Sequence, residues 1–324
     1  MSAAGDLAIE TTGLRKEFRS RRGRRVVAVD DLDLAVPAGG VHGFLGPNGS
    51  GKTTTIRMLL GLARATRGEM ALLGEPVPRR LPQVMSRVGA VVEQPKFTPG
   101  FTGRTNLQLL ARCVGAPTTT VDTALAMVGL DGRDRDRYRT YSLGMRQRLA
   151  IAATLLGSPR LLILDEPTNG LDPAGIRDIR TMIRSLGESG VTVLLSSHIL
   201  AEVQQVCHSV TIIGGGRVLA SGAVDDLVSE YAVHTYSVGV ADPAAATQVL
   251  TGAGYRVRRE DDRLTVDGPD QPSGGFGEQI TRVLADERIY VRELRPVSAD
   301  LESVFLRLTH DESLKVTRPE DGAG

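Results

Sequence analysis

The chain has 324 residues, and its 39 Lys and Arg side chains against 38 Asp and Glu leave a formal net charge of +1. That length allows two or three compact units, and the balanced charge gives no indication of nucleic acid or of acidic partners. Cys113 and Cys207 lie too far apart for a redox or metal-binding spacing, which is typical of a reducing, cytosolic protein. No apolar run reaches the roughly 18–20 residues of a membrane helix, and no secretory signal opens the chain. We therefore expect a polypeptide that does not span a membrane.

Two strands are predicted at the start of the chain, over residues 8–19 and 26–34, because apolar and polar residues alternate there. The segment between them, 19–25, contains five arginines. Such a run is compatible with a site for anionic lipid headgroups, but a solvated hairpin tip is the favoured interpretation. Pro37 and two following glycines then predict a turn.

The motif G-x-x-x-x-G-K-[ST], typical of a phosphate-binding P-loop, follows this turn. Its residues are Gly46, Pro47, Asn48, Gly49, Ser50, Gly51, Lys52, Thr53 and Thr54. A short apolar strand over 41–45 precedes it, and helical spacing of apolar residues follows it. In that context the glycines turn backbone N–H groups onto phosphate oxygens, and the helix N-terminus adds positive potential. Lys52 would reach the β- and γ-phosphates, and the Thr53 hydroxyl would bind Mg²⁺.

Polar residues follow three further predicted strands, over 88–92, 161–164 and 191–197. Gln94 comes after the first strand, Asp165 and Glu166 end the second, and His198 ends the third. Open α/β sheets place their ligands at the carboxyl ends of the strands. Asp165 would therefore hold the Mg²⁺ shell, and Glu166 would act as general base toward the attacking water.

Gln94 can contact both Mg²⁺ and that water, and His198 can donate to the γ-phosphate. Taken alone, His198 fits a hydrogen-bonded structural histidine somewhat better than a phosphate donor. Between these strands, residues 95–157 have helical spacing, interrupted at 131–137 by alternating acidic and basic residues that predict a solvated loop.

A hairpin over 211–220, with its turn at 214–216, closes this first domain. A change of composition near Glu230 starts a second unit, whose predicted order β-α-β-β-α-β matches a ferredoxin-like fold. A helix from Ser298 follows, and the charged tail from His310 is predicted to be disordered. The fold class is thus α/β, a P-loop NTPase with an inserted helical subdomain and a small α+β unit. The expected domains are 1–230 (core 1–94 and 158–230, helical subdomain 95–157), an accessory domain over 231–309, and a tail over 310–324.

The order of motifs resembles the ATPases of ABC transporters over about residues 7–230. Gly46–Thr54, Gln94, Asp165-Glu166 and His198 are similar to the Walker A, Q-loop, Walker B and H-loop motifs. Ser142-Leu143-Gly144-Met145 is similar to the signature motif, and Gly170-Leu171-Asp172 to the D-loop. Leu143 and Met145 replace a glycine and a glutamine of the usual signature, a form similar to that of daunorubicin- and bacitracin-type drug-export ATPases.

The resemblance implies further site residues. Phe18 takes the place of an aromatic residue that stacks on adenine, although a core phenylalanine of the first strand is the alternative. Ser142 and Gly144 would cap the γ-phosphate of ATP bound to a second, facing subunit, with Asp172 also at that nucleotide site. A helix that begins at a serine, with its first N–H groups free, is suited to bind an anion.

The resemblance also implies the function and the partners. The chain is expected to be the ATP-hydrolysing, Mg²⁺-dependent subunit of an exporter of drug-like or hydrophobic compounds. It would pair with a copy of itself and with separate membrane permeases, expected to be two, at the cytoplasmic face of the cell membrane. Nucleic acid is not expected as a partner. A soluble ABC ATPase acting on a macromolecular complex and an ABC importer ATPase are the alternatives. For the accessory domain, a structural role is favoured over a regulatory one.

Overall fold

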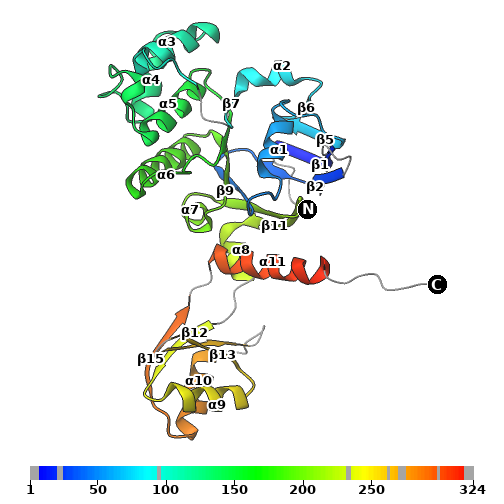
Figure 1. The fold of residues 1–324 in the computed structure, drawn as a ribbon, viewed down its shortest axis with the longest axis vertical. Coiled ribbons are helices and arrows are strands. Elements are labelled where there is room, and N and C mark those ends of the chain that lie inside the picture. Colours follow the sequence, from blue (N-terminus) through cyan, green and yellow to red (C-terminus); the bar gives the residue numbers. More distant parts are fainter. Residues whose placement is uncertain are drawn as a thin grey trace, which may run out of the picture. The chain divides into compact units, whose positions relative to one another are not determined.

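The computed structural model describes residues 7–19, 25–92, 96–230, 235–260, 263–268, 275–297 and 300–316. The chain forms a larger unit, Met1–Val224 with Leu308–Gly324, and a smaller unit, Asp225–Arg307. Figure 1 shows the helices and strands of both units. Among the described residues, no helix combines the length and the apolar character needed to cross a membrane.

The first sheet of the larger unit is antiparallel and has the strand order β2-β1-β5-β6, with β3 also paired to β1. Its strands are β1 (Leu7–Arg19), β2 (Arg25–Leu32), β3 (Ala35–Pro37), β5 (Arg67–Leu72) and β6 (Glu75–Val77). The predicted strand over 26–34 corresponds to β2, which ends at Leu32, and the separate strand β3 begins at Ala35. Strands β5 and β6 were not predicted, because only Met70, Leu72 and Val77 supply buried side chains to them.

The second sheet is mainly parallel and has the order β11-β10-β4-β9-β8-β7. Its strands are β4 (Val41–Leu45), β7 (Val88–Val91), β8 (Leu161–Asp165), β9 (Thr192–Ser197), β10 (Ser209–Gly214) and β11 (Arg217–Ala223). Every residue of β4 and β9 is buried, as expected for strands covered on both faces. The predicted hairpin at 214–216 is confirmed by the antiparallel pairing of β10 with β11.

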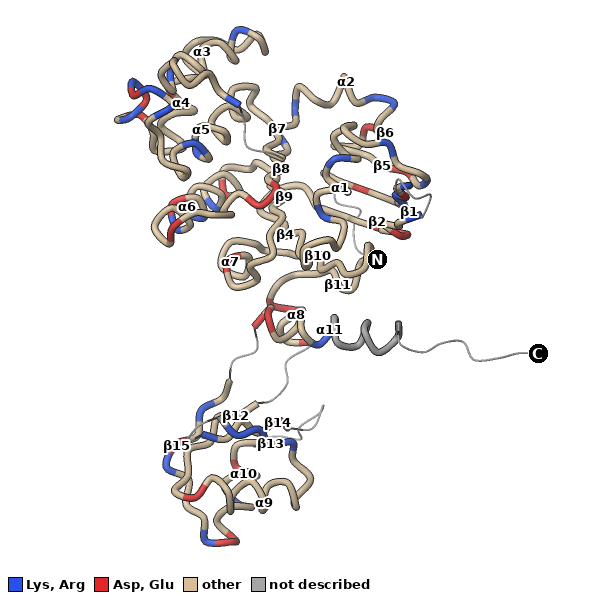
Figure 2. Tube along the Cα trace, viewed as in Figure 1, with Lys and Arg blue, Asp and Glu red and all other residues tan. Residues whose placement is uncertain are grey.

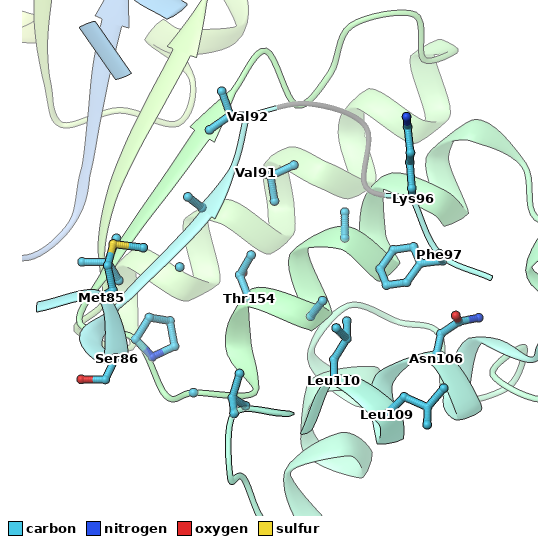
Figure 3. A pocket seen from close by; sticks show the side chains of 18 of the residues that line it. Met85, Ser86, Val91, Val92, Lys96, Phe97, Asn106, Leu109, Leu110 and Thr154 are labelled. Atoms are coloured by element: carbon cyan, nitrogen blue, oxygen red, sulfur yellow. The ribbon is translucent and has the colours of Figure 1, made fainter. Parts of the chain in front are cut away.

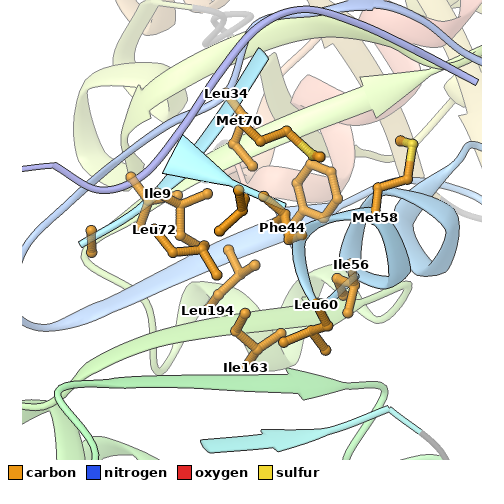
Figure 4. Close-up of a cluster of buried hydrophobic side chains, with 14 of the residues drawn as sticks. Ile9, Leu34, Phe44, Ile56, Met58, Leu60, Met70, Leu72, Ile163 and Leu194 are labelled. Atoms are coloured by element: carbon orange, nitrogen blue, oxygen red, sulfur yellow. The ribbon is translucent and has the colours of Figure 1, made fainter. Parts of the chain in front are cut away.

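The main hydrophobic core lies between these sheets, around α1 (Lys52–Leu59). Figure 4 shows Ile9 and Leu72 of the first sheet and Ile163 and Leu194 of the second. Phe44, near the end of β4, is fully buried among them. The loop between β4 and α1 is therefore attached to a closely packed core at both ends.

Helices cover the remainder of the larger unit. They are α2 (Leu81–Val84), α3 (Gly103–Cys113), α4 (Thr119–Met127), α5 (Leu143–Leu155), α6 (Pro173–Glu188) and α7 (Leu200–Gln204). Helices α3, α4 and α5 confirm the helical pattern predicted between the strands at 88–92 and 161–164. Side-chain caps begin three of the helices, with Thr102 accepting from Thr105 N and Asp172 from Gly175 N at 3.1 and 3.0 Å. The third cap, Ser142, belongs to the site.

The loop at 131–137, where charges alternate along the chain (Figure 2), is not solvated throughout as predicted. Asp134 is only 4% exposed, and its carboxylate accepts a hydrogen bond from Arg104 Nε. Its carbonyl also accepts the Arg104 N–H at 2.9 Å. The prediction was wrong at this position because a charge pattern does not reveal that the loop runs beside the first turn of α3, where a cation is available.

The smaller unit contains a four-stranded antiparallel sheet in its described part, ordered β13-β14-β12-β15. Its elements are β12 (Thr235–Val240), α9 (Pro243–Gly252), β13 (Arg256–Glu260), β14 (Arg263–Asp267), α10 (Phe276–Asp286) and β15 (Val291–Val297). The predicted β-α-β-β-α-β order is confirmed, and Val238, Leu264, Phe276 and Ile280 belong to a separate core. Helices α8 (Val224–Glu230) and α11 (Leu301–Val316) flank these elements in sequence. The backbone of α11 thus runs into the segment for which the sequence predicts disorder, and residues 317–324 lie outside the described residues.

Candidate nucleotide-binding site

The phosphate loop connects β4 to α1 and depends on glycine at three positions. Gly49 and Gly51 have φ of +84° and +108°, a region that side-chain-bearing residues rarely adopt. A Cβ on Gly51 would also lie 2.6 Å from Ala28 O, and one on Gly46 would lie 2.5 Å from Ile213 O. The loop therefore packs closely against neighbouring strands. The first turn of α1 contains no acidic residue, which leaves the positive helix end available to an anion.

Lys52 lies within the loop rather than in solvent. Its residue is 5% exposed, and its ammonium donates to Gly46 O at 2.6 Å and to Pro47 O at 3.2 Å. The same nitrogen lies 3.5 Å from Glu166 Oε1. An ammonium held by carbonyl oxygens in a glycine cradle is well placed to exchange those oxygens for phosphate oxygens.

The carboxyl end of β8 brings two carboxylates to this loop. Ser196, the partner of Asp165 in the β8–β9 register, donates its hydroxyl to the Asp165 carboxylate. The Glu166 N–H donates to Ser196 O at 3.2 Å, and Glu166 itself has φ of +51°. Its Oε2 lies 2.6 Å from His198 Nδ1. Glu166 thus contacts Lys52 on one side and His198 on the other.

The oxygen donors of the loop suit a small, hard cation bound together with phosphate. Thr53 is half-buried, and the buried hydroxyls of Ser50 and Thr55 have no hydrogen-bond partner among the described residues. In the same part of the chain, no group of three or more His, Cys, Asp or Glu side chains is arranged to hold a metal alone. Mg²⁺ ordinarily takes one or two protein oxygens and completes its shell with phosphate and water. The Thr53 hydroxyl and the Asp165 carboxylate fit that requirement.

Phe18 lies on the surface near the end of β1 and is 45% exposed. The Lys16 ammonium lies 4.9 Å from the centroid of its ring. The alternative of a core phenylalanine is thereby wrong, because the ring contributes little to the buried clusters. An exposed aromatic face with an adjacent cation is suited to stacking on a flat ring.

The signature and D-loop residues lie at the starts of two helices. Ser142 is exposed, and its hydroxyl accepts the N–H of Met145 at 3.2 Å as the cap of α5. Asp172, also exposed, caps α6. The Arg146 N–H donates to Ser142 O, so the N–H groups of Leu143 and Gly144 precede the intrahelical pattern.

A separate groove of about 940 Å³ lies in the helical region, between β7, α3 and α5. Figure 3 shows Val91, Phe97, Leu110 and Thr154 around it. Leu109 and Leu110 are 42% and 37% exposed, so the groove presents apolar side chains to solvent.

Comparison with known proteins identifies the family. The model of the ABC transporter family matches residues 29–169. The chain is 44% identical to the bacitracin transport ATP-binding protein BcrA of Bacillus licheniformis, over 68% of this chain and 71% of BcrA. It is 36% identical to the daunorubicin/doxorubicin resistance ATP-binding protein DrrA of Streptomyces peucetius, over 93% of this chain and 92% of DrrA. A solved ATP-binding subunit of an ABC transporter matches with a TM-score of 0.60 and 28% identity, over 69% and 93% of the two chains. The chain belongs to the ABC transporter family.

Within this ABC transporter subunit, the structure brings together Lys52, Glu166 and His198, which the sequence assigned to three separate motifs. Gln94 lies outside the described residues. The ABC motifs did not identify Ser196, which contacts both Asp165 and the backbone of Glu166. Ser196 could have been found from the sequence, because it lies at the end of the predicted strand that leads to His198.

Proposed function

We propose that this chain powers an ABC exporter by hydrolysing ATP, and that the exporter removes drug-like or hydrophobic compounds through a separate membrane protein. The observation that carries the proposal is the meeting of Lys52, Glu166 and His198 beside the phosphate loop. The compound class follows from relatives named for bacitracin transport and for daunorubicin or doxorubicin resistance. The match to DrrA covers 93% of this chain, so it extends into the smaller unit.

Four residues of this chain would carry out hydrolysis. When the γ-phosphate enters the loop, Lys52 exchanges its carbonyl acceptors for phosphate oxygens, and His198 donates to the same phosphate. Glu166 is thereby released to accept a proton from water. The water oxygen bonds to the γ-phosphorus, and the bond from that phosphorus to the β-phosphate oxygen breaks. Gln94 is proposed to orient the water.

Mg²⁺ bound with ATP would supply charge neutralisation at the β- and γ-phosphate oxygens. The Thr53 hydroxyl and the Asp165 carboxylate are the proposed protein ligands, together with Gln94. Ser196 would hold Asp165 in place, because its hydroxyl already donates to that carboxylate. Phe18 would stack on the adenine ring from its exposed position.

The exposed position of Ser142 supports the proposal that a second copy of the chain completes the site. Ser142 and the N–H groups of Leu143 and Gly144 form a helix N-terminus open to an anion. In a facing arrangement these groups would bind the γ-phosphate held by the other subunit, with Asp172 at the same interface. An isolated monomer would then bind ATP but hydrolyse it poorly.

The groove between β7, α3 and α5 is the proposed docking surface for the permease. Three of its apolar lining residues, Leu109, Leu110 and Val114, are exposed, as expected of a surface that a partner covers. Two permeases, one for each cassette, would hold the dimer at the cytoplasmic face of the cell membrane. Closing and opening of the dimer would drive alternating access.

The glutamine variant Glu166→Gln tests the function. It keeps the side-chain volume but lacks a carboxylate that can take a proton, so ATP turnover should fall by about 10²–10⁴-fold. ATP should still drive dimerisation in size-exclusion chromatography. The exposed Glu69→Gln serves as the matched control and should hydrolyse ATP as the wild type does. Wild-type turnover in the Glu166 variant would remove this residue as the base.

We propose residues 231–309 as an accessory domain with a structural role. Its separate core supports that role, and its described residues contain no metal-binding group. A chain ending at Glu230 tests the proposal through basal and drug-stimulated ATP turnover. Loss of drug stimulation with unchanged basal turnover and dimerisation would contradict a structural role.

A further inference from the structure

The signature turn and the D-loop turn of this chain pack against each other through the side chains of Leu143 and Leu171. Leu143, the first residue of α5, is half-buried. Its Cδ2 lies 3.3 Å from the position that a Cβ on Gly170 would occupy. Leu171 Cδ2 lies 3.8 Å from the corresponding position on Gly144, and α5 packs against α6 beyond this point. A glycine at position 143 would lack the side chain that makes this contact.

One end of this contact leads to Glu166. The Asn169 N–H donates to Glu166 O, and the Leu171 N–H donates to Thr168 O, both at 3.2 Å. The Thr168 hydroxyl also donates to Glu202 Oε2 at 2.9 Å. These bonds make the segment from Glu166 to Leu171 a series of tight turns rather than a free loop. A displacement of Glu166 is therefore transmitted to Leu171 over a short, hydrogen-bonded path.

The other end leads to the signature. Leu143 directly follows Ser142, whose hydroxyl and carbonyl accept the N–H groups of Met145 and Arg146 at 3.2 and 2.9 Å. The capped turn therefore moves as one piece with the Leu143 side chain. In the proposed dimer, Glu166 serves the nucleotide of its own subunit, whereas Ser142 serves the nucleotide of the facing subunit.

We propose that Leu143 is a positioning residue that couples the two nucleotide sites of the dimer, and this rests on the proposed function. Its contact with Gly170, next to the contact of Leu171 with Gly144, holds the signature turn to the segment that carries Glu166. Occupation of one site, which moves Glu166 away from Lys52 and His198, thereby changes the position of Ser142 in the other site. Binding at the two sites is then cooperative, because each subunit has two packed arrangements that both nucleotides influence.

The test replaces Leu143 with glycine in the full-length chain. The matched control is Leu81→Gly, because Leu81 is also the first residue of a helix, is half-buried, and packs its Cδ2 against the positive-φ Gly61. The conservative variant Leu143→Met restores an apolar side chain of similar volume. The measurements are the Hill coefficient, KM and kcat of ATP hydrolysis, with ATP binding by the dilute monomer and the melting temperature alongside.

We expect a Hill coefficient above 1 in the wild type and in Leu81→Gly, and about 1 in Leu143→Gly. The KM of Leu143→Gly should rise by about 5-fold or more, the lower end of ordinary coupling between sites. Its ATP binding as a monomer should be unchanged, and Leu143→Met should recover the cooperativity. An unchanged Hill coefficient in Leu143→Gly, an equal loss in Leu81→Gly, or a non-cooperative wild type would each overturn the proposal. Failure of the proposed function is distinguishable, because it would instead appear as wild-type turnover in Glu166→Gln.

Discussion

Three glycines of the phosphate loop are expected to respond differently to the same substitution by alanine. At Gly49, φ is +84° and an added Cβ has nothing within 4 Å, so alanine introduces backbone strain alone. At Gly46, the backbone is not in the left-handed region, but a Cβ would lie 2.5 Å from Ile213 O. At Gly51, φ is +108° and a Cβ would lie 2.6 Å from Ala28 O, so both effects apply.

The magnitudes follow from these contacts. Left-handed backbone costs a side-chain-bearing residue about 1–2 kcal/mol, offset by about 0.4–1 kcal/mol from the lower entropy of the unfolded chain. A collision with a backbone oxygen adds about 1–3 kcal/mol, because a strand must move rather than a flexible side chain. We therefore expect Gly49→Ala to lose about 1 kcal/mol of unfolding free energy. Gly46→Ala should lose about 1–2 kcal/mol and Gly51→Ala about 3 kcal/mol on the same basis.

The assay is urea denaturation of the nucleotide-free protein, followed by far-UV circular dichroism because the chain has no tryptophan. Gly49→Ala is the internal control, since it lies in the same loop and gains the same methyl group. Equal losses in Gly49→Ala and Gly51→Ala would refute the reasoning, because packing of Gly51 against β2 would then have no measurable effect.

Three further predictions concern regions outside the loop. Asp134→Ala removes a buried partner of the partly exposed Arg104. Urea denaturation should show that the free energy of unfolding falls by about 2 kcal/mol. An unchanged value would mean that the ion pair contributes nothing to stability. Burial lowers the pKa of His42 to about 4, below its usual 6.5, so the unfolded chain takes up the proton first. The contribution of neutral His42 to the free energy of unfolding is full above pH 6.5 and decreases by about 3 kcal/mol as the pH falls to 4. His42→Asn should make the free energy of unfolding less dependent on pH over this range. The same pH dependence in the variant would contradict the prediction. Phe276→Ala removes a ring packed edge-on against two tyrosines, and should destabilise the smaller unit by about 3–5 kcal/mol. Basal ATP turnover measured in parallel should persist, and its loss would show that the two units do not fold independently.

Local features of this protein could be predicted from the sequence because their causes lie within a few neighbouring residues. The phosphate loop needs Gly49 and Gly51 at positive φ, and an apolar run such as 161–164 forms a buried strand wherever it pairs. The β-α-β-β-α-β order of the smaller unit is likewise a succession of local patterns. Strands β5 and β6 were not predicted, because they contain few apolar residues. Helix α6 was not predicted although its apolar residues have helical spacing.

The neighbours of each strand were decided by the tertiary structure alone. Glu166 meets Lys52 and His198 because β9 lies between β4 and β8 in the sheet, although about 150 residues separate β4 from β9 in the chain. The contact of Leu143 with Gly170 has the same origin, since it depends on how α5 and α6 pack. Residue types and spacing determine which groups can bind a phosphate. Which of those groups touch depends on long-range packing, and a hydrophobic pattern shows that a face is buried without showing what covers it.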